Sequence, residues 1–77
     1  MDKMVELDEM FDEMIDMQRQ KVLKRARLSN PKLSADDILQ PFDYPDLQKD
    51  PIFHFEDGIL AGLISAQAAV RNKLRNS

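Results

Sequence analysis

The feature that most constrains this chain is a stretch from about Asp2 to Leu28 that holds a helical period and contains neither Gly nor Pro. Residues three and four apart lie on one face of an α-helix, so this spacing predicts an amphipathic helix over about 3–28. The predicted inner face comprises Met4, Leu7, Phe11, Met14, Ile15, Gln18, Val22 and Ala26. At 1.5 Å per residue such a helix is about 40 Å long. It therefore needs a packing partner along its whole length.

A second long helix is predicted over about 51–75. Asp50 is suited to an N-cap, and Pro51 follows at the first helical position, where proline is favoured. A bulky apolar stripe predicts the core-facing side, with Ile52, Ile59, Leu60, Leu63, Ala66, Val70 and Leu74. Both helices carry acids early and bases late, which suits the helix dipole. An antiparallel pair places each acidic end beside the other's basic end, so we expect a helical hairpin.

The connection over 29–50 is too long for a simple turn, because helix–helix connections usually take about 2–8 residues. Asn30-Pro31 ends the first helix, and Ser34 with Asp37 forms an approximate capping box for a short helix near 35–39. Leu33 and Ile38 are placed as a hydrophobic staple. We therefore expect an ordered strap, which three side chains anchor to the helices: Phe42, Tyr44 and Leu47.

The chain is expected to form one all-α domain over 1–77, and several features favour association. A chain of 77 residues without cysteine has a small core and no disulfide to support it, so oligomerisation is a common source of extra stability. Met10 and Met17 widen the apolar face of the first helix beyond the width that one neighbour covers. We predict a homodimer that forms a four-helix bundle.

A strip of small residues on the second helix has three interpretations at this stage. Gly58, Gly62, Ser65 and Ala69 share one side, where another backbone could approach closely. The strip could contact the chain's own first helix, a second copy or a ligand. The residues predicted to take part in interactions are these four together with Met10, Met14, Met17, Phe42 and Tyr44.

Catalytic and metal-binding interpretations are weaker. His54 is the single histidine, and Asp50, Glu56 and Asp57 could pair with it, but the sequence offers no second His or Cys and no Gly-rich phosphate loop. The acids of the first helix and of the strap match no calcium loop, and the methionines are typical of a core or interface rather than a copper site. We expect no enzyme activity, no cofactor and no bound metal.

The charge balance bears on partners and location. A net charge of −3 disfavours nucleic acid, although the basic run over 19–27 keeps a nucleic-acid-associated regulator as an alternative. The longest uncharged run, Gly58 to Val70, is too short for a membrane span, and the acidic N-terminus is unlike a secretory signal. We therefore expect a cytoplasmic protein–protein interaction or oligomerisation module. A small enzyme or metal-binding protein that uses His54 is the other alternative.

Overall fold

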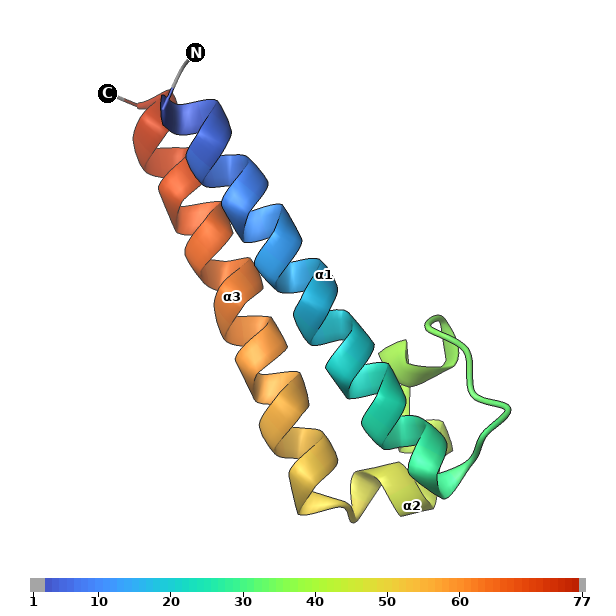
Figure 1. Cartoon of the computed structure of the whole chain (residues 1–77). Coiled ribbons are helices and arrows are strands. Elements are labelled where there is room, and N and C mark those ends of the chain that lie inside the picture. The colour runs from blue at the N-terminus through green and yellow to red at the C-terminus, as the bar shows by residue number, and fades with distance from the viewer. Residues whose placement is uncertain (1–2, 77) are drawn as a thin grey trace.

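A computed structural model describes residues 3–76 of the chain, which form an all-α fold with no strand among them (Figure 1). Asp2, where the predicted helical pattern begins, lies outside the described residues. The elements in order are α1 (Lys3–Ser29), the 3₁₀ turns η1 (Asp37–Leu39) and η2 (Pro41–Asp43), the one-turn helix α2 (Pro45–Gln48) and α3 (Pro51–Arg75). The two long helices predicted over 3–28 and 51–75 are confirmed.

The helices α1 and α3 pack side by side and run antiparallel, so the two ends of the described chain lie at the same end of the molecule (Figure 1). The molecule is a rod with extents of 44 × 19 × 18 Å. Its radius of gyration is 14.8 Å, against about 11.5 Å for a compact domain of this length. We call the end that carries the connection the strap end and the other the open end.

The strap over 30–50 is ordered by local hydrogen bonds. The predicted capping box is present: the Ser34 amide donates to Asp37 Oδ2 at 2.8 Å, and the Asp37 amide donates to Ser34 Oγ at 3.3 Å. The short helix that follows is a 3₁₀ turn over Asp37–Leu39 rather than an α-helix over 35–39. Prediction missed η2 and α2, both of which begin at a proline.

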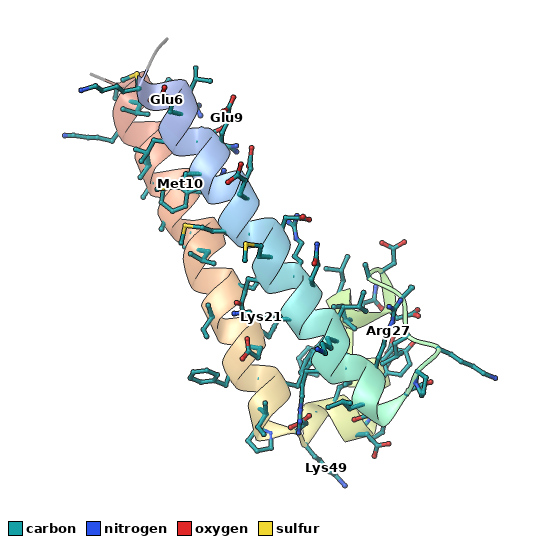
Figure 2. All side chains as sticks on the ribbon, viewed as in Figure 1. Glu6, Glu9, Met10, Lys21, Arg27 and Lys49 are labelled. Carbon is teal, nitrogen blue, oxygen red and sulfur yellow. The ribbon has the colours of Figure 1, made fainter. Side chains whose placement is uncertain are left out.

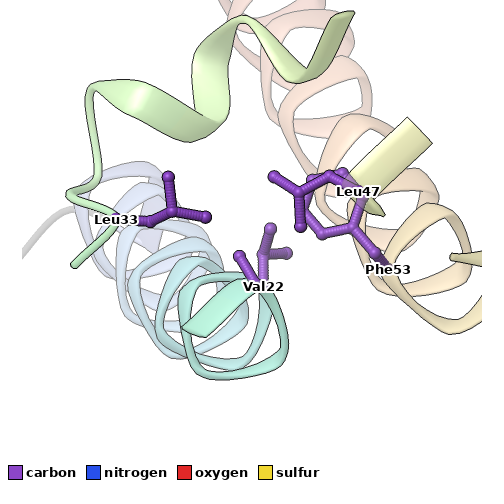
Figure 3. Packing of buried hydrophobic residues seen from close by; sticks show 5 residues of the cluster. Val22, Leu33, Leu47 and Phe53 are labelled. Carbon is purple, nitrogen blue, oxygen red and sulfur yellow. The ribbon is translucent and has the colours of Figure 1, made fainter. Parts of the chain in front are cut away.

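The hydrophobic core lies at the strap end, between the two long helices and the strap (Figure 3). Its buried members are Val22, Ala26, Leu33, Leu47 and Phe53, and three partly buried residues pack against them, Ile38, Tyr44 and Leu60. Leu47 and Tyr44 therefore anchor the strap as predicted. The prediction that Phe42 does so is wrong, because its side chain is 78% exposed.

The inner face of α3 differs from the predicted stripe. Ile52, Ile59 and Ala66 are exposed, whereas Phe53 and Gln67 are buried. Between Gly58 and Val70 α3 carries no charged residue, and its bulky apolar side chains include Ile64 as well as the predicted stripe, so the hydrophobic period alone does not fix the centre of the buried side. The position of α1 and the strap decides which side faces inward.

The inner face of α1 agrees better with prediction. Ile15, Gln18, Val22 and Ala26 are buried, and Phe11 is half-buried. The prediction is wrong for Met4, Leu7 and Met14, which are 38%, 38% and 41% exposed. The inner face of α1 is therefore well covered toward the strap end and poorly covered toward the open end.

Two bidentate Arg–Asp pairs join the long helices, one near each end. At the strap end, Arg25 Nε lies 2.9 Å from Asp50 Oδ2, and Asp50 also caps α3 by accepting from the Ile52 amide at 3.0 Å. At the open end, Arg71 Nε lies 2.6 Å from Asp8 Oδ1, and Nη2 lies 2.9 Å from Oδ2. Each pair joins a base of one helix to an acid at the start of the other, as the sorted charges predicted.

Candidate protein-interaction face

Large apolar side chains remain exposed along one side of the hairpin. We define the methionine face as Leu7, Met10, Met14 and Met17 of α1 together with Ile52 and Ile59 of α3. Their exposed fractions run from 38% for Leu7 to 62% for Met17. Leu63 and Val70 of α3 lie on the same flank and are half-buried. Figure 2 shows Met10 and Lys21 on the side of the helix pair that faces the viewer.

The two halves of the methionine face belong to the same side of the molecule. A groove near the strap end is lined by Lys21 and Leu28 of α1 and by Ile52 of α3, so these residues share a side. Met10, Met14 and Met17 precede Lys21 by eleven, seven and four residues, spacings that return to the same side of a helix. Ile59 follows Ile52 by seven. The methionine face therefore spans both helices.

The strap covers the side of the helix pair that lies opposite the methionine face. A groove on that side is lined by Ile38 and Leu39 of the strap, Arg19 of α1, and Asp57 and Leu60 of α3. Arg19 and Lys21 are two residues apart, which turns them by about 200° around the helix axis. No element within residues 3–76 covers the methionine face.

The exposed surface area of the chain is large for its mass. The chain exposes 5845 Å², whereas a compact monomer of 8.9 kDa exposes about 4,800 Å². The excess is about 1,000 Å². A standard protein–protein interface covers about 800 Å² on each partner, so one partner of ordinary size would remove most of the excess.

Two buried glutamines lie between α1 and α3. Gln18 Nε2 donates to the Glu56 carbonyl at 2.9 Å and to Glu56 Oε2 at 2.6 Å. Gln67 Nε2 donates to Asp12 Oδ1 at 2.8 Å. Both glutamines are buried, and every fully buried side-chain N or O atom among residues 3–76 has a hydrogen-bond partner. The hydrogen bonds of Gln18 and Gln67 fix the register of the two helices, but these polar side chains contribute little apolar burial.

Apolar burial is therefore concentrated at the strap end. From Gln18 to the open end, the only buried side chains within the described chain are Ile15, Gln18 and Gln67. The helices there are held by half-buried residues and by the Arg71–Asp8 pair, which is partly exposed and contributes modestly. The open-end half of the hairpin therefore has less apolar burial than the strap end.

The small-residue strip does not face the chain's own first helix, so that interpretation is wrong. Gly58, Gly62, Ser65 and Ala69 are all exposed. Apart from the helix's own backbone and the adjacent residues, no described heavy atom lies within 4 Å of the place that a Cβ would take at either glycine. The strip lies on the outer side of α3, beside the methionine face.

The two aromatic residues predicted to interact are placed differently. Phe42 is exposed on the strap, whereas Tyr44 packs against the core. Burial raises the pKa of the Tyr44 hydroxyl, and the nearby Asp37 carboxylate raises it further. The hydrogen bond from the Ser34 amide lowers the pKa of Asp37. Tyr44 thus has a structural role, and Phe42 remains available to a partner.

His54 is held by backbone rather than by an acid. Its Nε2 donates to the Gln48 carbonyl at 2.6 Å, and its ring lies edge-on to Phe53 with centroids 5.7 Å apart. Asp50 is paired with Arg25, and Glu56 accepts from Gln18. Two of the three acids proposed to serve His54 therefore have other partners. Within residues 3–76 no group of three His, Cys, Asp or Glu side chains is arranged to hold a metal ion.

The basic run at 19–27 is partly used inside the fold. Arg25 pairs with Asp50, and Arg27 Nε donates to the Leu33 carbonyl at 2.8 Å. Arg19 points toward the strap side and Lys21 toward the methionine face, as the two grooves show. Lys21, Lys24 and Arg25 line one groove, whereas Arg19 lines the groove on the strap side, so the bases are divided between two sides of α1.

Comparisons with protein-family models, curated proteins and solved structures find no match to this chain. In the part of the chain that the structure describes, neither long helix is apolar enough over a sufficient length to cross a membrane.

Proposed function

We propose that this protein is a non-catalytic protein–protein interaction and oligomerisation module whose binding surface is the methionine face. The observation that carries the proposal is the continuous row of exposed Leu7, Met10, Met14 and Met17 beside exposed Ile52 and Ile59. Methionine is flexible and polarizable, so a row of methionines adapts well to an apolar partner. A helix pair with one uncovered apolar side is half of a four-helix bundle.

Photo-crosslinking in cells that express the protein tests this function. A photoreactive amino acid placed at Met17 is expected to form a covalent adduct with a protein of defined mass. The same amino acid at Leu39 is the matched control, because Leu39 is also apolar and is 77% exposed but lies on the strap side. Adducts at Met17 that are absent at Leu39 support the proposal. Equal labelling at both positions, or none at Met17, contradicts it.

A further inference from the structure

We infer that the partner on the methionine face is a second copy of this chain, which docks with its α1 antiparallel to the α1 of the first. The inference rests on the proposed function and names the partner that the face accepts. Its basis is the sign and position of the charges that border the face. These charges differ between the two halves of α1.

Charged side chains of both signs border the methionine face on α1. Glu6 and Glu13 lie one turn to either side of Met10, Lys21 and Lys24 follow Met17 by one and two turns, and Lys3 precedes Leu7 by one turn. All five are exposed, and none takes part in an ion pair within residues 3–76. Asp8, Arg25 and Arg71 are used inside the hairpin. The border charges are therefore free to pair with another molecule.

The spacing of these charges matches a two-fold axis across the middle of α1. Glu6 and Lys24 lie at equal distances from residue 15, and Glu13 and Lys21 lie at equal distances from residue 17. The helix Lys3–Ser29 has its midpoint at residue 16. Consider a two-fold axis that passes through this midpoint, parallel to the methionine face and perpendicular to the helices. It lets the α1 helices of two copies overlap along their whole length. It also brings Glu6 near Lys24 of the other copy and Glu13 near Lys21.

The same axis places the apolar residues against one another. Met14 and Met17 lie within two residues of the midpoint, so those of two copies would lie against one another, and Met10 would lie beside Lys21 of the other copy. The uncharged segment Gly58 to Val70 of α3 would meet its counterpart. The result is a four-helix bundle in which each strap lies on an outer side. Apolar burial supplies the affinity, and the exposed charge pairs, each worth about 0–1 kcal/mol, select the orientation.

The alternative two-fold axis runs along the helices and gives a poorer match of charge. It would set α1 of one copy against α3 of the other, so that Glu6 and Glu13 would no longer approach Lys24 and Lys21 of the other copy. Opposite charges that face one another across an interface favour the arrangement that brings them together. The antiparallel arrangement makes four opposite-charge approaches from the same eight side chains.

A charge-exchange experiment with the full-length chain tests the arrangement. The variant K21E/K24E carries a net charge of −7 and the variant E6K/E13K a net charge of +1, since each exchange moves the native value of −3 by four. Neither variant removes an ion pair within the described hairpin, so both are expected to keep wild-type helix content. Sedimentation equilibrium at low salt should show that each variant alone dimerises at least tenfold more weakly than wild type. An equimolar mixture should form a heterodimer at least as readily as wild type forms its homodimer.

Several outcomes overturn the inference. If each variant dimerises like wild type and the mixture shows no preference for the heterodimer by native mass spectrometry, the antiparallel pairing is wrong. If the wild-type chain is monomeric at 200 μM while Met17 crosslinks to a different protein in cells, the second copy is the wrong partner and the proposed function stands. If Met17→Glu leaves a wild-type dimer intact and no adduct forms at Met17, both the inference and the proposed function fail.

Discussion

Phe53 and Ile52 are adjacent, yet the structure gives them opposite roles in stability. The Phe53 side chain is fully buried among Val22, Leu33 and Leu47, whereas Ile52 is 50% exposed. Truncation of a buried Phe to Ala typically costs about 3–5 kcal/mol through lost burial and the cavity left behind. A chain of this length has a total stability of about 4–12 kcal/mol. Phe53→Ala should therefore remove a large share of it or unfold the protein.

Urea unfolding followed by circular dichroism at 222 nm measures this difference, with Ile52→Ala as the matched control. All samples should be compared at one low protein concentration, because association stabilises the folded state by mass action and Ile52 belongs to the methionine face. A loss of 3 kcal/mol corresponds to a fall in melting temperature of at least about 12 °C for a domain of this size. Ile52→Ala should cost less than about 1.5 kcal/mol, as expected for a half-exposed side chain. If Ile52→Ala proved as harmful as Phe53→Ala, the assignment of the inner face of α3 would be refuted.

Three further predictions concern other parts of the fold. Gly62→Ala should raise the melting temperature by about 2–8 °C, because it adds about 0.5–1 kcal/mol of helix propensity and its methyl group enters open space. A lower melting temperature for Gly62→Ala would mean that another group contacts the helix at this position. Tyr44→Ala should lower the free energy of unfolding by about 1–3 kcal/mol in the same urea assay, since Tyr44 packs on the core. Phe42→Ala should change it by less than about 0.5 kcal/mol, because Phe42 is exposed. The reverse order would mean that the strap docks differently. Hydrogen bonds from Arg25 hold the pKa of Asp50 below its usual range, so their stabilisation is present above the unfolded value of about 3.9 and is lost as the pH falls through the lower folded value. Melting temperatures recorded from pH 7 to pH 2 should therefore fall less steeply for Asp50→Asn than for wild type, and parallel curves would show that the pair contributes nothing.

Local features of this chain were determined by sequence alone. The bounds of α1 and α3 follow from helical period, from the absence of Gly and Pro before residue 29, and from the Asp50-Pro51 start of the second helix. The Ser34–Asp37 capping box and the Asp50 cap form as their spacing predicts. Antiparallel packing also follows, because the charge sorting along each helix is written in the sequence. These features depend on neighbours within a few residues or on charge order.

The candidate interface was visible only in part from the sequence. Met10 and Met17 lie beside the main apolar stripe of α1, and this position led to the prediction that they take part in an interaction; both side chains are exposed. Ile52 and Ile59 were assigned to the core because a bulky apolar residue at helical spacing is indistinguishable from a core residue until the neighbouring elements are placed. The contribution of α3 to the methionine face therefore came from the structure.

Only the tertiary structure decided which side of each long helix is inside. Between Gly58 and Val70 α3 carries no charge on any side, so the centre of its buried side is set by where α1 and the strap lie. Gln67 is buried because Asp12 of α1 offers it a hydrogen bond, a long-range partner that helical period does not encode. Gly58 and Gly62 face open space for the same reason, since the close contact that small residues permit needs a helix on that side and the described chain places none there. Sequence determined the two helices and their direction, and the packing of distant elements determined which surfaces were left for a partner.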